Sequence, residues 1–332
     1  MIRGCLAALF LCSIIGSAAA QERVTVGTMR SINNSVLFLG EIQGYFKAEG
    51  LDLEMTAYAS DEDVVEALAG GATDLGLAGL TATAFNLAGA RKISVIAAQV
   101  REKTDYEGNI IVVSNVAYDR GIRKMEDLAS MSVATFKLGT ALHYQLSQIA
   151  RVKKFNFATM TLKPQNSIAA VVRMVQSSTA DAAILPGPEA RELLTSNYAK
   201  LLGWYSEVDE AQLGALFASA KAIESKRPTL EKFLRAYRRA AGDYYTNFLR
   251  HDRFSKRMTN AKSQELASKI ARYVFPGRAK SVADELEAGL YYMERDAKLD
   301  AADIARQVAW YQSQNLVDKN VDPRAIVDSS FK

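Results

Sequence analysis

The sequence is poor in residues that carry redox chemistry, bind metals or form disulfides. It holds two cysteines and two histidines in 332 residues. Both cysteines, Cys5 and Cys12, lie in the first 20 residues, so the chain after residue 20 has neither a disulfide nor a thiol nucleophile. His143 and His251 belong to no H-x-x-x-H pattern or cysteine cluster that is typical of a metal site. We therefore expect no metal site and no thiol chemistry.

The motifs of common catalytic and nucleotide-binding sites are also missing. The chain has no G-x-S-x-G elbow, no phosphate-binding P-loop and no G-x-G-x-x-G fingerprint. A catalytic pair of carboxylates is left open, because the distance between two side chains is invisible in a sequence. We expect a protein that is not an enzyme and that has no catalytic residues and no cofactor.

Long apolar runs are scarce after the N-terminus. An apolar run at 6–15 follows Arg3 and precedes three alanines at 18–20, the order of a secretory signal peptide cleaved before Gln21. This run is too short to span a bilayer comfortably, and no later run is apolar enough. We expect residues 1–20 to be a cleaved signal peptide and the mature protein to be soluble in the periplasm.

An excess of either charge is missing as well. Lys and Arg total 41 and Asp and Glu total 37, a net charge of +4 that loses one unit with Arg3. A protein that binds nucleic acid through its phosphates is usually much more basic. We therefore expect no nucleic-acid partner.

What the chain does contain is the pattern of a parallel α/β sheet. Residues 24–28 alternate like a short strand, and a polar loop at 29–35 follows. Apolar residues at 38–46 then recur with the spacing of one helix face, and Gly50 stands where a left-handed helix terminator belongs. Residues 51–55 form the next predicted strand. Loops at the carboxyl ends of such strands are where open α/β sheets bind ligands.

The same pattern begins again near residue 132. Strands are predicted at 75–78 and 182–185, and an aspartate, Asp74 or Asp181, precedes each of them by one position. Each aspartate follows the first strand of its half by about the same length of chain. We interpret this as two similar α/β lobes whose strand-end loops face one cleft. A single long doubly wound sheet is the alternative.

Several segments together resemble a known family. Their order and spacing are similar to those of periplasmic solute-binding proteins of the nitrate/sulfonate/taurine type, which share the NMT1/THI5-like domain. The resemblance covers nearly all of the mature chain. The segments are GYFKAEGLDLE at 44–54, ALAGGATDLGLAG at 67–79, KMEDLASMSVAT at 124–135, STADAAILPGPEA at 178–190 and LVDKNVDPRAIVDSSF at 316–331.

The resemblance implies a two-lobed periplasmic-binding-protein fold of type II. Each lobe would be a mainly parallel sheet flanked by helices, and the hinge would have two crossings, near 116–120 and 208–213. Lobe 1 would comprise 21–117 and 213–332, and lobe 2 would comprise 118–212. Long helices are predicted in the C-terminal part at 228–248, 264–274, 281–298 and 304–315.

The resemblance also implies a function and its partners. The protein would be a monomer that captures a small anionic solute by hinge closure and passes it to an ABC permease in the inner membrane. Two alternatives are left open. One is a pyrimidine-precursor enzyme, although the members with this activity depend on a cysteine-rich motif that the mature chain lacks. The other is a solute sensor that feeds a membrane receptor.

The expected ligand site combines four loops. In lobe 1, polar residues after the first strand and a helix start near 81 would form one wall. In lobe 2, the loops near 139 and 188 would form the other wall, where helix N-termini attract anions. Glu189 would accept hydrogen bonds from an amine or hydroxyl of the solute. The predicted site residues are Arg30, Asn33, Asn34, Ser35, Gly79, Leu80, Thr81, Leu138, Gly139, Thr140, Ala141, Gly187 and Glu189.

Overall fold

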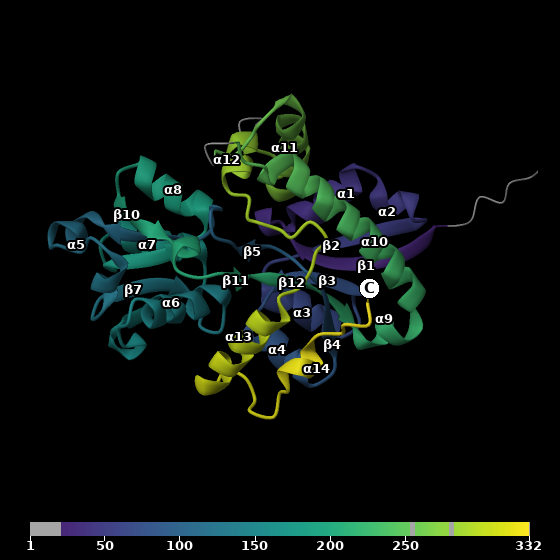
Figure 1. Cartoon of the computed structure of the whole chain (residues 1–332), viewed down its shortest axis with the longest axis horizontal. Helices are drawn as coiled ribbons and strands as arrows, with labels where there is room; N and C mark the ends of the chain where they lie inside the picture. The colour runs from purple at the N-terminus through teal and green to yellow at the C-terminus, as the bar shows by residue number, and fades with distance from the viewer. Residues whose placement is uncertain (1–20, 253–255, 279–281, 332) are drawn as a thin grey trace, which may run out of the picture.

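Two mixed sheets flanked by helices form the body of the protein. The computed structural model describes residues 21–252, 256–278 and 282–331. Each main sheet has five strands, and the two sheets lie side by side in separate lobes (Figure 1). The predicted two-lobed α/β fold is therefore confirmed, and the alternative of a single sheet is wrong. The predicted signal peptide, with Cys5 and Cys12, lies outside the described residues.

The first sheet has the strand order β2-β1-β3-β12-β4. Strands β1, β2 and β3 are parallel, and β12 returns antiparallel between β3 and β4. The strands are β1 (Glu22–Met29), β2 (Leu51–Tyr58), β3 (Leu75–Gly79), β4 (Ile93–Ala98) and β12 (Gly214–Ser219).

The second sheet has the equivalent order β10-β6-β9-β7-β8. Here β7 is parallel to β8 and β9, and β6 lies antiparallel between β9 and β10. The strands are β6 (Ile110–Ser114), β7 (Ser132–Phe136), β8 (Thr161–Gln165), β9 (Ala182–Leu185) and β10 (Ala199–Trp204).

A two-stranded ribbon carries the chain between the lobes. It consists of β5 (Arg101–Glu102) and β11 (Ala211–Gln212), which are antiparallel. The second crossing coincides with the predicted 208–213. The first lies upstream of the predicted 116–120, because β6 pairs with β9 and β10. We therefore propose a first lobe boundary near residue 102 in place of 117; the sequence of β6 is apolar enough for either sheet.

The duplicated aspartates make the same contact in both lobes. Asp74 Oδ2 accepts hydrogen bonds from the backbone N–H and hydroxyl of Thr25, both at 3.0 Å. Asp181 Oδ2 accepts the same pair from Ser132, at 2.9 and 2.7 Å, and both pairs are 49 positions apart. Each aspartate thus ties the start of one central strand to the loop before its neighbour, which supports the interpretation of a duplicated unit.

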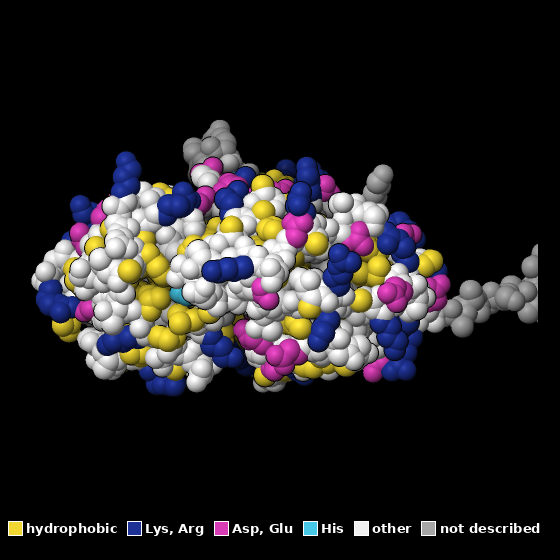
Figure 2. All heavy atoms as spheres, turned by 90° about the horizontal axis from the view of Figure 1, so that it is seen from below, with side chains coloured by type: hydrophobic (Ala, Val, Ile, Leu, Met, Phe, Trp, Pro, Cys, Tyr) yellow, Lys and Arg dark blue, Asp and Glu magenta, His cyan; other side chains and the backbone are white. Residues whose placement is uncertain are grey.

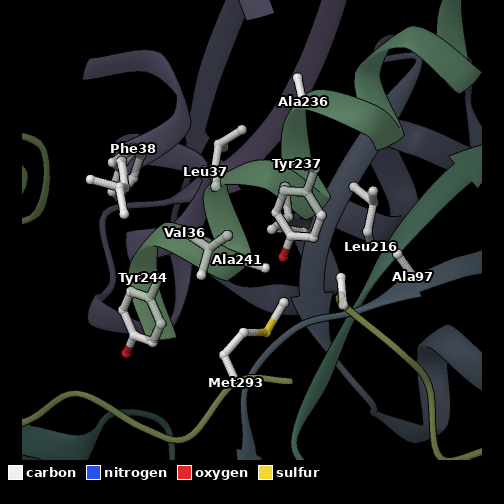
Figure 3. Close-up of a cluster of buried hydrophobic side chains, with 14 of the residues drawn as sticks. Val36, Leu37, Phe38, Ala97, Leu216, Ala236, Tyr237, Ala241, Tyr244 and Met293 are labelled. Atoms are coloured by element: carbon white, nitrogen blue, oxygen red, sulfur yellow. The ribbon is translucent and has the colours of Figure 1, made fainter. Parts of the chain in front are cut away.

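Helices cover both faces of each sheet. In lobe 1, α1 and α10 pack together and their side chains interdigitate in the hydrophobic core that Figure 3 shows. The lobe 1 helices are α1 (Ser35–Ile42), α2 (Tyr45–Ala48), α3 (Asp61–Ala69), α4 (Ala82–Gly89), α9 (Ala220–Ser225) and α10 (Arg227–Tyr244). The lobe 2 helices are α5 (Asn115–Asp119), α6 (Ala141–Val152), α7 (Ile168–Gln176) and α8 (Gly187–Thr195).

The C-terminal helices flank the space between the lobes on opposite sides. In Figure 1, α11 (Ala261–Val274) and α12 (Val282–Ala288) lie above it, and α13 (Ala301–Ser313) lies below, followed by α14 (Pro323–Ile326). The predicted helix 281–298 is too long, since α12 ends at Ala288. A Cβ on Gly289 would lie 2.6 Å from Pro188 of α8, so the backbone itself approaches lobe 2 here. From that point the chain runs extended, and Tyr292 bridges to Arg101 of the hinge.

Helix α13 joins the two lobes through apolar contacts. Trp310 packs edge-on against Tyr144 of α6, with ring centroids 5.5 Å apart. Tyr311, on the same helix, contacts Phe85 of α4 at 5.8 Å. One hydrophobic cluster therefore extends from lobe 1 into lobe 2 along this side.

The surface carries both charges. On the face in Figure 2, the Lys and Arg side chains and the Asp and Glu side chains are interspersed, in agreement with the balanced composition. Within the described ranges, no helix combines the length and the apolar character that crossing a bilayer requires.

Candidate functional site

A cavity of about 570 Å³ lies between the lobes at the carboxyl ends of the central strands. Lobe 1 contributes the ends of β1, β2 and β3, and lobe 2 contributes the starts of α6 and α7. Asn109 precedes β6 and Tyr291 comes from the C-terminal segment. The lining residues are Met29, Asn33, Ala59, Ser60, Asp61, Asp63, Gly79, Thr81, Asn109, Phe136, Lys137, Thr140, Ala141, Leu142, Asn166, Ser167, Ile168, Pro186, Leu213 and Tyr291.

A smaller cavity of about 280 Å³ adjoins the first. It lies toward α11 and α12, and its wall includes Val274, Phe275, Glu285, Gly289 and Tyr291. Of the two cavities, only the smaller one is lined by Arg30 and Glu189. The residues common to both cavities are Met29, Asn33, Ile168, Pro186 and Tyr291.

The lobes already touch across the larger cavity. The N–H of Ala82, the first residue of α4, donates to the carbonyl of Gly139 in lobe 2 at 2.8 Å. Lys137 Nζ lies 3.8 Å from Glu62 Oε2 of α3. Gly139 has φ +81°, a conformation that favours glycine, and this allows its carbonyl to reach the other lobe. The two lobes are therefore in direct contact beside the cavity.

The N-terminus of α6 faces the cavity without a side-chain cap. Thr140 occupies its N-cap position, but its hydroxyl donates to the Lys137 carbonyl at 2.8 Å and accepts no helix N–H. Ser60, Thr81 and Ser167, in contrast, cap α3, α4 and α7. The N–H groups of residues 141–143 have no protein acceptor among the described residues. Such unpaired N–H groups and the positive end of the helix dipole attract an anion.

Asp61 brings a carboxylate to the opposite wall. It is the first residue of α3, and its Oδ1 accepts the Gly79 N–H at 2.7 Å. Burial raises the pKa of Asp61 to about 6, although the Gly79 bond opposes this shift and the neighbouring Glu62 adds to it. The cavity thus has a carboxylate on the lobe 1 side and helix N–H donors on the lobe 2 side.

A buried polar network connects the cavity floor to the hinge. Tyr291 donates its hydroxyl hydrogen to Asn109 Oδ1 at 2.6 Å, and Asn109 Nδ2 donates to Gln145 at 2.7 Å. Glu102 Oε1, in the hinge strand β5, accepts from the Asn109 N–H at 2.9 Å and from Gln145 Nε2 at 3.0 Å. Burial raises the pKa of Glu102 to about 7, against the effect of these two bonds.

The structure brings several predicted site residues together. Asn33, Gly79, Thr81, Thr140 and Ala141 line the larger cavity, and Arg30, Asn33 and Glu189 line the smaller one. The Glu189 Oε2 atom is buried and has no hydrogen-bond partner among the described residues. Burial, as well as the nearby Glu285 and Glu192, raises the pKa of Glu189.

Other predicted residues line neither cavity. Asn34 and Ser35 are buried, and their side chains donate to the carbonyls of Met29 and Ile32. Asn34 is the N-cap of α1, but its side chain accepts no N–H of that helix. The remaining four are in different surroundings. Leu80 is buried, Leu138 is 46% exposed, and Gly187 lies beside Arg191. The Gly139 carbonyl accepts a hydrogen bond from the Ala82 N–H.

The sequence analysis did not predict several of the residues that line the larger cavity. Asp61 is the first residue of its helix, where the helix dipole favours an acid, and this explains an acid there without any ligand. Lys137 stands in the predicted loop, next to Leu138, and the loop position alone could have suggested it. No local signal marks Asn109 or Tyr291, because the turn after α12 and the crossing between the sheets bring them to the cavity. Among the described residues, no group of three or more His, Cys, Asp or Glu side chains could hold a metal ion.

Comparison with known proteins agrees with this geometry. A family model described as NMT1/THI5 like matches residues 31–247, more than half of the chain. No curated protein sequence matches the chain.

Solved structures share the fold at low sequence identity. One is the periplasmic aliphatic sulphonate binding protein SsuA of Escherichia coli, with a TM-score of 0.70 and 17% identity over 93% of this chain and 92% of that one. The alkanesulfonate-binding protein SsuA of Xanthomonas axonopodis pv. citri, bound to MOPS, has a TM-score of 0.67 and 17% identity over 94% and 99%. The Candida albicans CA3427 gene product, which has the generic periplasmic binding protein fold, has a TM-score of 0.65 and 11% identity over 92% and 96%.

Proposed function

Because the chain belongs to the NMT1/THI5-like family, we propose that it is the extracytoplasmic solute-binding component of an ABC-type importer. It captures a small organic anion, such as a sulfonate or carboxylate, between its lobes and delivers it to a permease in the inner membrane. The location in the periplasm and the partnership with a permease are parts of this proposal, as is action as a monomer.

The uncapped start of α6 is the observation that carries the proposal. An anionic group of the solute would accept hydrogen bonds from the N–H groups of residues 141–143, for which the described part of the chain provides no acceptor. Lys137 lines the same cavity and adds a positive charge nearby. A helix N-terminus that faces a cavity without a cap is a common way to bind an anion.

Hinge closure would hold the solute. The ribbon of β5 and β11 is the narrow connection between the main sheets, and the cavity walls come from both lobes. Only the closed state would offer the solute the donors of lobe 2 and the polar groups of lobe 1 together. The solute would therefore shift the population toward closure by its difference in affinity for the two states.

Thermal unfolding of the purified chain from residue 21 onward tests the proposal. The protein is first stripped of ligand by unfolding and refolding, and is then melted with a panel of sulfonates, aromatic carboxylates, nitrate and aminopyrimidines. A true solute at a hundred times its Kd should stabilise the fold by about 2.7 kcal/mol. A panel in which no compound raises the Tm would contradict the proposal.

Two proline variants test the role of α6. Ala141→Pro removes the first N–H of α6, and proline is tolerated at this helix position. Thr140 already has φ −105° and ψ 168°, which suit the residue before a proline. We expect about tenfold weaker binding with little change in the Tm of the empty protein. Ala301→Pro, at the exposed start of α13, is the matched control and should bind normally.

A further inference from the structure

The cavity contains a carboxylate that the protein leaves without a cation. Asp61 lines the cavity, and its Oδ1 is fixed by the Gly79 N–H. Among the described residues, Asp61 Oδ2 accepts no hydrogen bond and neither oxygen belongs to an ion pair. A partly buried carboxylate without a cation is unfavourable, because burial removes the water that would stabilise its charge.

The lysine that lines this cavity already forms an ion pair with a different carboxylate. Lys137 is the one Lys or Arg among the residues that line this cavity, and its Nζ pairs with Glu62 across the lobes. Asp63, the other acid of the lining, is exposed, so water can stabilise its charge. Asp61 is therefore the partly buried carboxylate of the lining, and no cation among the described residues pairs with it.

The walls between Asp61 and the start of α6 are largely apolar. Side chains of Met29 and Leu213 come from lobe 1 and the crossing, and those of Phe136, Leu142 and Ile168 come from lobe 2. A solute that fills this space would have an apolar body between two polar ends. One end would meet helix N–H donors, and the other would meet a lone carboxylate.

We propose that the solute carries, besides its anionic group, an ammonium or similar cationic N–H group that binds Asp61 Oδ2. The solute is thus a zwitterion with an apolar spacer, and Asp61 determines this specificity. This inference rests on the proposed function, since it names the solute class of the same cavity. Charge-assisted hydrogen bonds of this type are shorter and stronger than neutral ones.

Pairs of compounds that differ only in the cationic group test the inference. In 3-aminopropanesulfonate and butanesulfonate, an ammonium replaces a methyl group of about the same size. The pairs 4-(aminomethyl)benzoate with 4-ethylbenzoate, and the corresponding benzenesulfonates, repeat this change on an aromatic body. Isothermal titration calorimetry at pH 7.5 should give at least tenfold tighter binding for the ammonium member of the pair that fits the cavity.

Two variants identify the residue that makes the difference. Asp61→Asn keeps an acceptor for the Gly79 N–H but removes the charge, so the preference for the ammonium member should disappear. Glu66→Gln removes the same charge from an exposed position of the same helix that does not line the cavity, and it should keep the preference. If Asp61→Asn does not fold, the comparison of paired compounds on the unchanged protein still decides the question.

The pH dependence gives a second readout. Burial raises the pKa of Asp61 to about 6, and the charged groups around it are Glu62 and Asp63 on α3 and Lys137 from lobe 2. The ammonium preference should therefore shrink as the pH falls from 7.5 to 5, in the unchanged protein and in Glu66→Gln alike. In Asp61→Asn the ratio should not change with pH.

The outcomes separate the inference from the proposed function. If the alkyl member binds as tightly as its ammonium partner, Asp61 does not select a cation and the inference is wrong, while capture of an anion stands. If Asp61→Asn retains the preference, another group receives the ammonium and the inference is also wrong. If no compound of the pairs or of the wider anion panel binds, both the proposed function and the inference fail.

Discussion

At the scale of single residues, the two duplicated aspartates make the same bonds in different sheets. Burial raises the pKa of each carboxyl, but bonds from Thr25 and Lys226 outweigh this at Asp74, and bonds from Ser132 and Arg120 outweigh it at Asp181. The net pKa of both is lowered. A lowered pKa means that the folded state holds the ionised form more favourably than the unfolded chain does.

Replacement of either aspartate by alanine should therefore destabilise the fold. We expect a loss of about 1–3 kcal/mol in the free energy of unfolding for Asp74→Ala and a similar loss for Asp181→Ala at pH 7. The stabilisation is present above the unfolded pKa of 3.8 and disappears as the pH falls through the lower folded value. Urea unfolding between pH 3 and 7 measures the difference.

An exposed acid serves as the control for this prediction. Glu224→Ala, on the surface of α9, should leave the free energy of unfolding nearly unchanged. A loss that is equally large at pH 3 and pH 7 would mean that the aspartates act through packing and not through their charge.

The sequence could predict these aspartates but only part of the ligand site. The aspartates stand at fixed distances from recurring strand patterns, so their equivalence is a local signal. A local sequence pattern cannot tell whether the side chains of Asn34 and Ser35 face solvent or bond to preceding carbonyls. In the structure, both side chains bond to preceding carbonyls. Tyr291 is distant in sequence from every other lining residue, and only the path of the folded chain brings it to the cavity.

At the scale of elements, the hinge strand β5 contains a buried acid. Glu102 is 1% exposed, and its Oε2 has no hydrogen-bond partner among the described residues. Burial raises its pKa from 4.5 to about 7, so the folded state holds the proton more tightly than the unfolded chain between these values. Stability is therefore highest below this window and falls as the pH rises through it.

Glu102→Gln should remove this pH dependence. Relative to the unchanged protein, the variant should gain stability as the pH rises from 4.5 to 7.5, by up to about 3 kcal/mol. Thermal unfolding across this range measures the difference. Glu66→Gln, at an exposed position of α3, is the control and should follow the unchanged protein. A parallel pH profile for both variants would show that burial does not raise the pKa of Glu102.

Helix starts were easier to predict than helix ends. Ser60 and Thr81 cap their helices as the sequence indicates, because an N-cap bond involves neighbours in the chain. The end of α12 at Ala288 depends instead on the approach of Gly289 to Pro188, which belongs to the other lobe. The apolar positions of 281–298 continue past this point, so periodicity alone extends the helix too far.

At the scale of the molecule, a small number of contacts join the two lobes across the cavity. The Ala82 N–H donates to the Gly139 carbonyl, and Lys137 pairs with Glu62. Helix α13 adds a third connection through Trp310 and Tyr144. The sequence predicted two lobes and a hinge, but it could not predict these contacts, because each joins residues whose local patterns belong to different lobes.

Ala82→Pro should shift the empty protein toward an open state. Proline is tolerated at the first position of α4 and removes only the N–H that reaches Gly139. The loss of one hydrogen bond, worth about 1 kcal/mol, should reduce the ratio of closed to open molecules roughly fivefold.

Spin labels on the two lobes can measure this ratio. The chain after residue 20 has no cysteine, so single cysteines at exposed Glu224 of lobe 1 and Lys154 of lobe 2 can be labelled selectively. Ala301→Pro again provides a control with proline at an exposed helix start. A distance distribution that is identical in Ala82→Pro and the control would show that the Gly139 bond does not contribute to closure.

The contribution of Tyr291 to the cavity also has a consequence for the order in which the site is made. Ribosomal synthesis proceeds from the N-terminus, and the other lining residues, from Met29 to Leu213, are all polymerised well before Tyr291. All strands of both sheets also precede this residue, since β12 ends at Ser219, whereas the phenol that bonds to Asn109 does not. A chain shortened to end before Tyr291 would therefore retain every strand and yet have an incomplete pocket.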